Sequence, residues 1–337
     1  MGIFNQPKVT PLPSVIMLDG KTSIVTGASG GMGLETARQL LALNVSTVIL
    51  AVRNMAKGED CKASLLADPA VKGHWWHDRK PTVKVMKLDM DDYGSIQAFA
   101  KAIKAEVPIV DYLLLNAGIG NLRYKRSITG HERTMQVNYL SNVLLLLELL
   151  PLLEASAVKT GSPSRVTWVG SRTHSQSTLA DRKKAVKPAE TVIGHMDDRK
   201  YFFPFHRFND TKLLGVMFLY ELAPRLDRTK VIVNMVCPGM VDAAMSDVLP
   251  IYLRIPINMV QAFRARTVEQ GVWLILNAMV VKGPDSHGTF ILDKDTQPRA
   301  DFIVSPAGEE VGKKLYSETM AEMRDYTDVP AGLLAMA

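Results

Sequence analysis

A glycine-rich turn near the N-terminus constrains the fold of this chain more than any other feature. The sequence TGASGGMG spans Thr26–Gly33, between an apolar run, Thr22–Val25, and an amphipathic run, Leu34–Leu43. Glycine lets the backbone turn tightly and approach a ligand closely, and a helix that starts here directs unpaired N–H groups and its positive dipole end outward. A strand, a glycine turn and a helix in this order predict a loop that binds a pyrophosphate.

Apolar runs typical of buried strands alternate with amphipathic, helical runs along the rest of the chain. The expected strands are Val45–Val52, Thr82–Leu88, Val110–Leu115, Arg165–Val169, Lys230–Val236 and Thr289–Leu292. The expected helices are Ala56–Leu66, Tyr93–Glu106, Glu132–Leu153, Asn209–Leu226, Arg266–Val280 and Ala307–Asp325. The alternation predicts an α/β fold with a Rossmann-type, doubly wound parallel sheet in one domain. Ligands of such sheets bind beyond the carboxyl ends of the strands, where Gly27, Asn116, Ser171 and Pro238 fall.

Segments outside this pattern divide the chain. Residues 1–20 form an N-terminal extension, 21–305 the domain, and 306–337 a C-terminal helix and tail. A polar insertion over about 173–207 is longer than an ordinary connection. An apolar, proline-interrupted stretch over about 240–265 is expected to form a substrate lid. The apolar side chains of Leu249–Val260 favour a bulky apolar substrate, with contact to a membrane surface or a second subunit as the alternative.

Composition narrows the functional classes. The net charge of +6 comes from scattered lysines and arginines, which favours a solvated basic surface over one that binds nucleic acid.

Two cysteines, Cys61 and Cys237, predict free thiols and a cytoplasmic protein. The apolar stretch Leu144–Leu153 is short, is interrupted by Glu148 and is closed by Pro151, so we expect a buried helix rather than a membrane span. His74 and His77 lack a further ligand at metal-binding spacing, so no metal is expected.

Two polar positions at strand ends predict the cofactor. Arg53 directly follows the second strand, where an acidic residue would bind a ribose 2′-hydroxyl and a basic one a 2′-phosphate. With Lys57 nearby it predicts NADP rather than NAD, although a solvated strand-end arginine has the same pattern. Asp89 ends the third strand, where a carboxylate could meet an adenine amino group.

Taken in order, these motifs resemble those of the short-chain dehydrogenase/reductase family. The resemblance covers roughly residues 21–289 and rests on the glycine loop, Asp89, the Asn116–Gly118 motif, Asn138, Ser171, Lys212 and the dipeptide Pro238-Gly239. Within the family the chain is most similar to retinol-dehydrogenase-like members, which share the pattern VRNxxKGE around Arg53–Glu59 and a long insertion before the active-site helix.

The resemblance implies a role for each matching residue. Lys212 would hold the nicotinamide ribose, Asn138 would order a water that links Lys212 to solvent, and Ser171 would hydrogen-bond the substrate oxygen. The residues implied to contact NADP are Gly27, Ser29, Gly31, Met32, Gly33, Arg53, Asp89, Asn116, Lys212, Pro238, Gly239 and Val241. Family members commonly pair through helices equivalent to Glu132–Leu153 and Asn209–Leu226, so a homodimer is one expectation and the oligomeric state stays open.

The central catalytic position departs from the family. The family places a tyrosine four residues before the lysine, where the ammonium lowers the phenol pKa and lets it exchange a proton with the substrate oxygen. Here that residue is Phe208, which has no titratable atom. A second departure is Ala243, where the family has a threonine against the nicotinamide carboxamide.

Phe208 leaves three hypotheses. The main one is an NADP(H)-dependent reductase or dehydrogenase of a bulky apolar carbonyl or alcohol in natural-product metabolism, with a substitute proton donor. The donors considered are Ser171, His206, Tyr201, Asp210 and a water held by Lys212, with Ser171 or water preferred. The alternatives are a non-redox isomerase, dehydratase or cyclase that uses the same pocket, and a catalytically silent binding protein.

Overall fold

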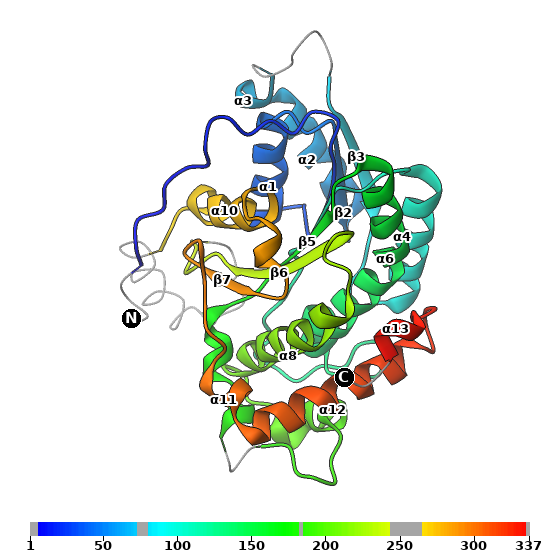
Figure 1. The fold of residues 1–337 in the computed structure, drawn as a ribbon, viewed down its shortest axis with the longest axis vertical. Helices are drawn as coiled ribbons and strands as arrows, with labels where there is room; N and C mark the ends of the chain where they lie inside the picture. Colours follow the sequence, from blue (N-terminus) through cyan, green and yellow to red (C-terminus); the bar gives the residue numbers. More distant parts are fainter. Residues whose placement is uncertain (1–5, 73–79, 182–184, 243–264, 335–337) are drawn as a thin grey trace.

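The computed structural model describes residues 6–72, 80–181, 185–242 and 265–334. Its centre is an eight-stranded sheet in the order β3-β2-β1-β4-β5-β6-β7-β8 (Figure 1). The strands are β1 (Thr22–Thr26), β2 (Thr47–Val52), β3 (Thr82–Lys87), β4 (Tyr112–Leu115), β5 (Ser164–Val169), β6 (Val231–Cys237), β7 (Phe290–Leu292) and β8 (Asp295–Thr296). Neighbouring strands from β3 to β7 pair in parallel, and β8 is antiparallel to β7. The predicted Rossmann-type α/β fold is confirmed.

Helices cover both faces of the sheet, which is why its central strands are mostly buried and rich in apolar residues. The longer helices are α1 (Gly31–Ala42), α2 (Met55–Ala67), α4 (Tyr93–Glu106), α6 (Ser141–Thr160), α8 (Arg207–Leu222), α10 (Val268–Leu276) and α12 (Pro306–Met323). One hydrophobic core lies between the sheet and α4, α6 and α8, and the other lies between the sheet and α1, α2 and α10. All seven residues of β6 are buried between the two.

The strand order reverses at β1, which pairs with both β2 and β4. Because neighbouring parallel strands end at the same edge, the segments after β1, β4, β5 and β6 meet there. This edge brings together Gly27, Asn116, Ser171 and Pro238, as the sequence predicts. The expected second strand starts late, at Thr47, because Asn44 adopts a left-handed turn conformation (φ 64°) before it.

The apolar helix does not end at Pro151, and that expectation is wrong. Helical backbone runs from Arg133 to Thr160, with a five-residue π-helical segment, η2 (Gln136–Leu140), before α6. Pro151 lies on the exposed side, so its ring removes one backbone hydrogen bond without disturbing the packed face. Among the described residues this is the one helix long and apolar enough to cross a membrane, and its most apolar window is 67% buried inside the fold.

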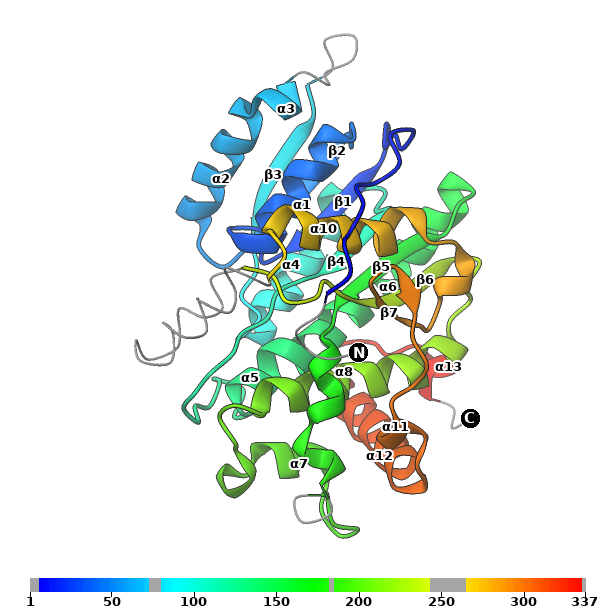
Figure 2. The ribbon, with the colours of Figure 1, turned by 90° about the vertical axis from the view of Figure 1, so that its left-hand side faces the viewer.

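The polar insertion folds into short helices that pack beside α8. They are η3 (Arg172–Gln176), η4 (Thr178–Ala180), α7 (Val192–Asp197) and η5 (Arg199–Tyr201). The C-terminal helix α12 lies against α8 and α7, on the side of α8 away from the sheet (Figures 1 and 2). A homodimer built on this side of α8 would therefore have to displace α12.

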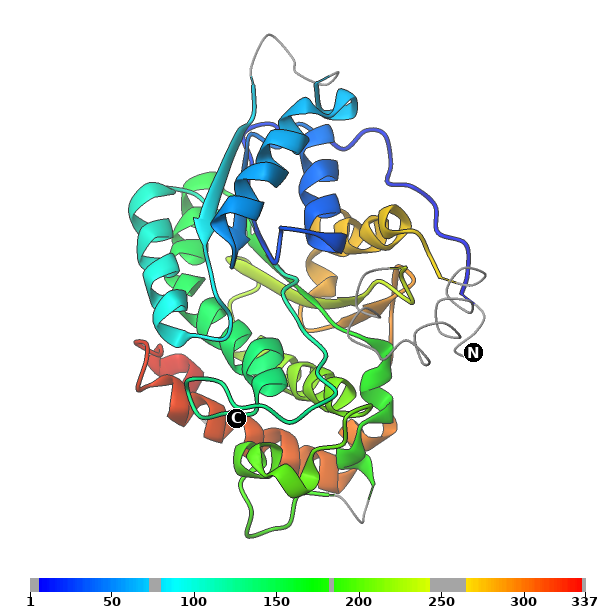
Figure 3. The same cartoon turned by 180° about the vertical axis from the view of Figure 1, so that it is seen from behind.

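The N-terminal extension runs past α1 and along α10 (Figure 3). Leu18 joins the core beside α1, with Val9, Leu12 and Ile16 packed against it. At its start the Gln6 side chain donates to the Met240 carbonyl (3.0 Å) and accepts from the Met240 N–H (2.7 Å). The lid residues Leu249–Val260, with Ala243, His74 and His77, lie outside the described residues.

Candidate active site

The glycine loop owes its shape to positions that need glycine. Gly27 and Gly31 have left-handed φ angles of 65° and 51°. Gly33 has no space for a side chain, because a Cβ there would lie 2.5 Å from the Gly27 carbonyl oxygen and 2.7 Å from Asn116 Nδ2. No side chain of the described residues caps α1, whose first turn begins at Gly31. Its backbone N–H groups are thus available to an anion, as pyrophosphate binding requires.

Thr26 and Asn116 fix this loop to the end of β4. The Thr26 hydroxyl accepts from the Asn116 and Ala117 N–H groups (2.9 and 3.0 Å) and donates to the Leu114 carbonyl. Asn116 Nδ2 donates to the Thr26 carbonyl at 2.9 Å. Asn116, Ser29 and Met32, which the resemblance assigns to the cofactor, all lie in or beside this loop.

Three basic residues, Arg53, Lys57 and Lys87, lie around the end of β2. Arg53 is exposed, and its carbonyl accepts from Lys87 Nζ at 2.5 Å. Lys57 Nζ lies 3.8 Å from the position of a Cβ on Gly30. Asn54 caps α2 by accepting from the Lys57 N–H, which fixes this lysine near the loop. The chemistry of the three cations fits a ribose 2′-phosphate.

Asp89 lies after β3, where the sequence places it. Its N–H donates to Ser95 Oγ (2.9 Å), and its Oδ1 accepts from the Asp91 N–H (3.1 Å). These bonds fix the half-buried carboxylate at the sheet edge.

Asn138, Ser171, Phe208 and Lys212 are called the catalytic corner here, after the roles that the family resemblance implies. Lys212 is its buried cation. Its Nζ donates to the Val169 carbonyl at 2.7 Å and lies 5.3 Å from the centre of the Phe208 ring. Burial lowers the pKa of Lys212 to about 8. Phe208 therefore provides an aromatic wall beside an ammonium group that can release its proton near neutral pH.

Asn138 joins the loop after β4 to α8. Its Oδ1 accepts from the Ile119 N–H (2.7 Å), and its Nδ2 donates to the Ile119 carbonyl (2.9 Å) and to Thr211 Oγ1 (3.1 Å). It lies within the π-helical segment η2, a backbone form often found at functional sites. Its amide contacts Thr211, the residue before Lys212, and both Asn138 Oδ1 (3.3 Å) and Lys212 Nζ (3.8 Å) adjoin the position of a Cβ on Gly118.

Ser171 follows β5 and begins the helix η3. Its Oγ lies 2.9 Å from Thr173 Oγ1 and accepts from the Thr173 N–H (3.2 Å). The Thr173 hydroxyl is a member of the site that the sequence interpretation missed, although the Ser-x-Thr spacing is a recognisable turn pattern.

Pro238, Gly239 and Val241 lie directly after β6, beside the catalytic corner. Gly239 has φ 84° and donates its N–H to Cys237 Sγ (3.4 Å), which also accepts from the Arg172 N–H (3.3 Å). Val241 pairs with Arg266 in an isolated bridge. The predicted cofactor residues at this strand end thus adjoin the segment that carries Ser171.

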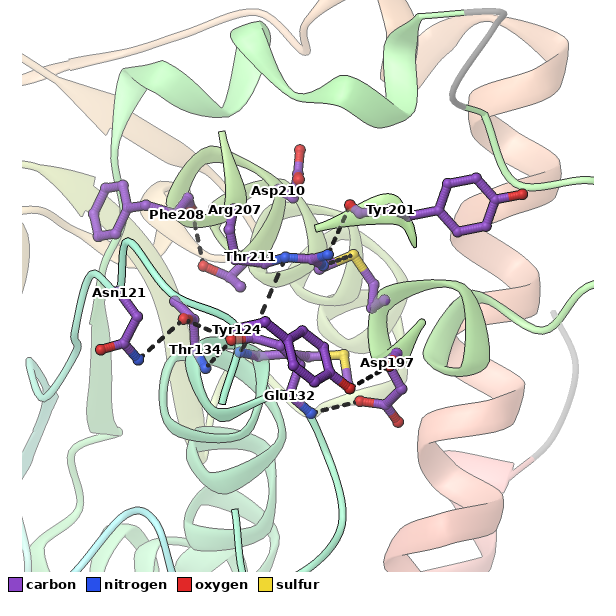
Figure 4. Close-up of polar contacts among 12 residues, drawn as sticks. Asn121, Tyr124, Glu132, Thr134, Asp197, Tyr201, Arg207, Phe208, Asp210 and Thr211 are labelled. Atoms are coloured by element: carbon purple, nitrogen blue, oxygen red, sulfur yellow. Dashed lines mark hydrogen bonds and ion pairs between the residues drawn. The ribbon is translucent and has the colours of Figure 1, made fainter. Parts of the chain in front are cut away.

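Two of the candidate proton donors are placed unfavourably. The Tyr201 hydroxyl donates to Glu190 Oε1 (3.0 Å), its ring stacks on His195, and it points away from Phe208 (Figure 4). Asp210 is buried and accepts hydrogen bonds from Ser177 and Thr178. His206 is exposed and precedes α8, so it stays a candidate. Ser171 and a water held by Lys212 are the preferred candidates that remain.

A buried ion pair lies beside the catalytic corner and was not predicted from the sequence. Arg207 and Glu132 are both fully buried, with Nε and Oε2 3.9 Å apart. They are far apart in the sequence, and neither belongs to a spacing pattern that would single it out. Among the described residues no group of three or more His, Cys, Asp or Glu could hold a metal ion.

Comparison with known proteins agrees with this geometry. The family model for short chain dehydrogenases matches residues 21–173. The chain is 57% identical to the short chain dehydrogenase macD of Penicillium terrestre, over 97% of this chain and 98% of that one. It is 55% identical to the short-chain dehydrogenase/reductase tropG of Talaromyces stipitatus, with the same coverage.

Solved structures share the fold at low identity. The RhlG/NADP complex of Pseudomonas aeruginosa matches with a TM-score of 0.60 at 22% identity, over 83% of this chain and 97% of that one. The 3-ketoacyl-(acyl-carrier-protein) reductase of Brucella melitensis, in complex with NADH, matches with a TM-score of 0.57 at 19% identity, over 82% and 97%. With its fold, its glycine loop and its full-length relatives, the chain belongs to the short-chain dehydrogenase/reductase family of oxidoreductases.

Proposed function

We propose that the protein is an NADP(H)-dependent reductase or dehydrogenase of a bulky apolar carbonyl or alcohol in fungal natural-product metabolism. The observation that carries the proposal is the buried Lys212 ammonium beside Phe208, with the Val169 carbonyl as its acceptor. Burial of a cation costs several kcal/mol, and a chain that has no use for it would replace it by an apolar residue.

The cofactor proposal rests on the cations beside the glycine loop. Arg53, Lys57 and Lys87 would hold a 2′-phosphate, whereas the 2′-hydroxyl of NAD has no need of them. Arg53→Asp should weaken NADPH binding by about tenfold or more and spare NADH, since one charge-assisted contact is replaced by repulsion. Equal loss for both cofactors in a fluorescence titration would remove the assigned role of Arg53.

Proton transfer is assigned to Ser171 and to a water held by Lys212. When bound, NADPH would supply the hydride that reduces the carbonyl carbon. The carbonyl oxygen then needs one proton, which the Phe208 ring cannot give. A water between Lys212 Nζ and this oxygen would deliver it, with the ammonium as the source and the Ser171 hydroxyl as the orienting donor.

The apolar substrate is supported by sequence alone, through Leu249–Val260 and through the likeness of Arg53–Glu59 to retinol-dehydrogenase-like members. The natural-product role is supported by relatives in filamentous fungi. A cytoplasmic location is supported by two buried free thiols, Cys61 and Cys237.

The missing hydroxyl of Phe208 favours one second candidate, a non-redox isomerase, dehydratase or cyclase. One experiment separates the two functions: incubate candidate substrates, follow NADPH absorbance, and measure product mass. Reduction requires loss of NADPH with a gain of two hydrogens in the product. Turnover at unchanged NADPH, without that mass change, would exclude the reductase.

A further inference from the structure

Asp210 is a buried carboxylate that connects α8 to the segment that starts at Ser171. It is 1% exposed. Its Oδ1 accepts from Ser177 Oγ (2.8 Å), from the Thr178 N–H (2.7 Å) and from Thr178 Oγ1 (3.1 Å). Ser177 and Thr178 follow directly after η3, which begins at the Ser171 cap. Asp210 therefore fixes the far end of a short segment whose near end carries the Ser171 hydroxyl.

Arg207 makes the corresponding connection from α8 to the helix that carries Asn138. Its partner Glu132 caps that helix by accepting from the Thr134 and Met135 N–H groups at 3.1 and 3.0 Å. Arg207 also donates to Met196 Sδ (2.9 Å) and to the Tyr201 carbonyl (2.8 Å), so its guanidinium is enclosed on several sides (Figure 4).

Both charges lie in the first turn of α8, on either side of Phe208. The same turn leads to Lys212, so one rigid helix start contacts the supports of Asn138 and Ser171. The Phe208 ring cannot hydrogen-bond to Asn138 or Ser171. The alignment of the catalytic corner must then come from neighbouring groups, and Arg207 and Asp210 are the buried charges placed to provide it.

We propose that Asp210 and Arg207 are positioning residues: they hold the segments of Ser171 and Asn138 in register with Lys212, in place of the missing phenol. The proposal rests on the proposed function only for its consequence on turnover. The contacts themselves can be tested without a substrate.

The Asp210 arm has a matched pair of variants. Asp210→Asn keeps an oxygen at the Oδ1 position, which takes three of the bonds, whereas Asp210→Ala removes every acceptor. We expect Asp210→Ala to speed amide hydrogen exchange in residues 171–180 by about tenfold or more, since it removes a charged acceptor that holds Ser177 and Thr178. Asp210→Asn should stay near wild type. NADPH affinity should hold in both variants, because Asp210 does not face the glycine loop.

Carbonyl-reductase activity gives the second readout once a substrate has been identified. Asp210→Ala should lower kcat by about 10²-fold with KM for NADPH unchanged, and Asp210→Asn should recover to within about threefold. If Asp210→Asn is as inactive as Asp210→Ala, the carboxyl is a proton donor and the positioning role is wrong. Unchanged exchange over 171–180 in Asp210→Ala would also overturn the proposal.

Two further variants complete the test: one replaces Asp210→Ala if that variant does not fold, and the other tests Arg207. If Asp210→Ala does not fold, Ser177→Ala removes one donor to the same oxygen and should speed exchange in the same residues by a smaller factor. For the other arm, Arg207→Lys keeps the charge but not the planar fork, and should speed exchange over 132–140. Wild-type protein that binds NADPH but reduces nothing would refute the proposed function, while the exchange results would still decide the positioning role.

Discussion

The glycine loop and the catalytic corner lie at the same edge of the sheet, but they are held in different ways. Backbone groups and missing side chains form the loop, where Gly33 adjoins the Gly27 carbonyl and Asn116 completes the contact. Long polar side chains from distant segments support the corner, as the Glu132–Arg207 pair shows. A pyrophosphate is the same in every member of the family, so backbone N–H groups suffice to bind it. Proton transfer depends on particular side chains, and at one of these positions, Phe208, this chain differs from the family.

Lys212→Met should cause the largest change. Methionine keeps most of the length of the unbranched side chain but removes the ammonium group, so we expect carbonyl reduction to fall by about 10²–10⁴-fold. Lys230→Met, at an exposed lysine before β6, is the matched control and should leave NADPH consumption unchanged. Full activity in Lys212→Met would mean that the corner performs no chemistry.

The pH profile tests the same group. In the proposed reaction, reduction consumes the proton of the Lys212 ammonium, whose pKa burial lowers to about 8. The protonated fraction falls as the pH rises through this value, so kcat/KM for reduction should decline above about pH 8. A flat profile up to about pH 10 would show that the proton of Lys212 takes no part in the reaction.

Gly33→Ala should test the backbone-built loop. The new Cβ would meet the Gly27 carbonyl at 2.5 Å, so the loop has to shift, and unfolding free energy should fall by about 3 kcal/mol. Gly30→Ala is the control, because that Cβ meets only Lys57 Nζ at 3.8 Å. Urea denaturation of both variants measures the difference. Equal stability of the two would show that close packing does not hold the loop.

Phe208→Tyr reverses the departure of the corner from its family. The new phenol would lie near the Lys212 ammonium, which lowers its pKa, and we expect carbonyl reduction to rise by about tenfold. The unfolding transition should not move, since the ring is already in place. Lack of any gain would indicate that the substrate oxygen no longer lies against this ring.

The loop was predictable because its signals are local. The strand, the four glycines of the loop and the helix follow one another directly in the sequence, and Arg53 and Asp89 come within two residues of their strand ends. The element order and the strand-end positions of Asn116, Ser171 and Pro238 followed from alternating patterns. The end of α6 was placed wrongly because Pro151 lies on an exposed face, where a helix tolerates it.

The supports of the corner could not be predicted in this way. Glu132 and Arg207 meet only after the chain has folded, and each alone resembles an ordinary surface charge. The role of Asp210 was equally hidden. The sequence suggested it as a proton donor, whereas in the fold its carboxylate accepts hydrogen bonds from hydroxyl and N–H groups. Burial converts these charges into structural contacts, and burial depends on contacts between distant segments.

His131 gives the smallest expected effect and shows how far the side-chain network extends. Its ring lies between Asp197 Oδ2 of α7 (2.7 Å) and Glu322 Oε1 of α12 (2.8 Å). Burial alone lowers the pKa of His131, but the hydrogen bonds to Asp197 and Glu322 outweigh it and raise this pKa to about 9. The folded pKa then exceeds the unfolded value of about 6.5, so the stabilisation is fully present below about pH 6.5 and is lost as the pH rises through about 9.

Urea denaturation at about pH 6 and about pH 9.5 should therefore differ by about 1 kcal/mol more in the wild type than in His131→Gln, which cannot titrate. Glutamine keeps a hydrogen-bond donor in the cluster, so the variant isolates the charge. His287→Gln is the control, because the hydrogen bonds of the His287 ring among the described residues join it to the Ala223 carbonyl and the Val233 N–H, and it should retain the wild-type pH dependence. If His131→Gln retains it as well, the ion pairs that join α7 to α12 contribute nothing to stability, and the network would end at Arg207 and Asp210.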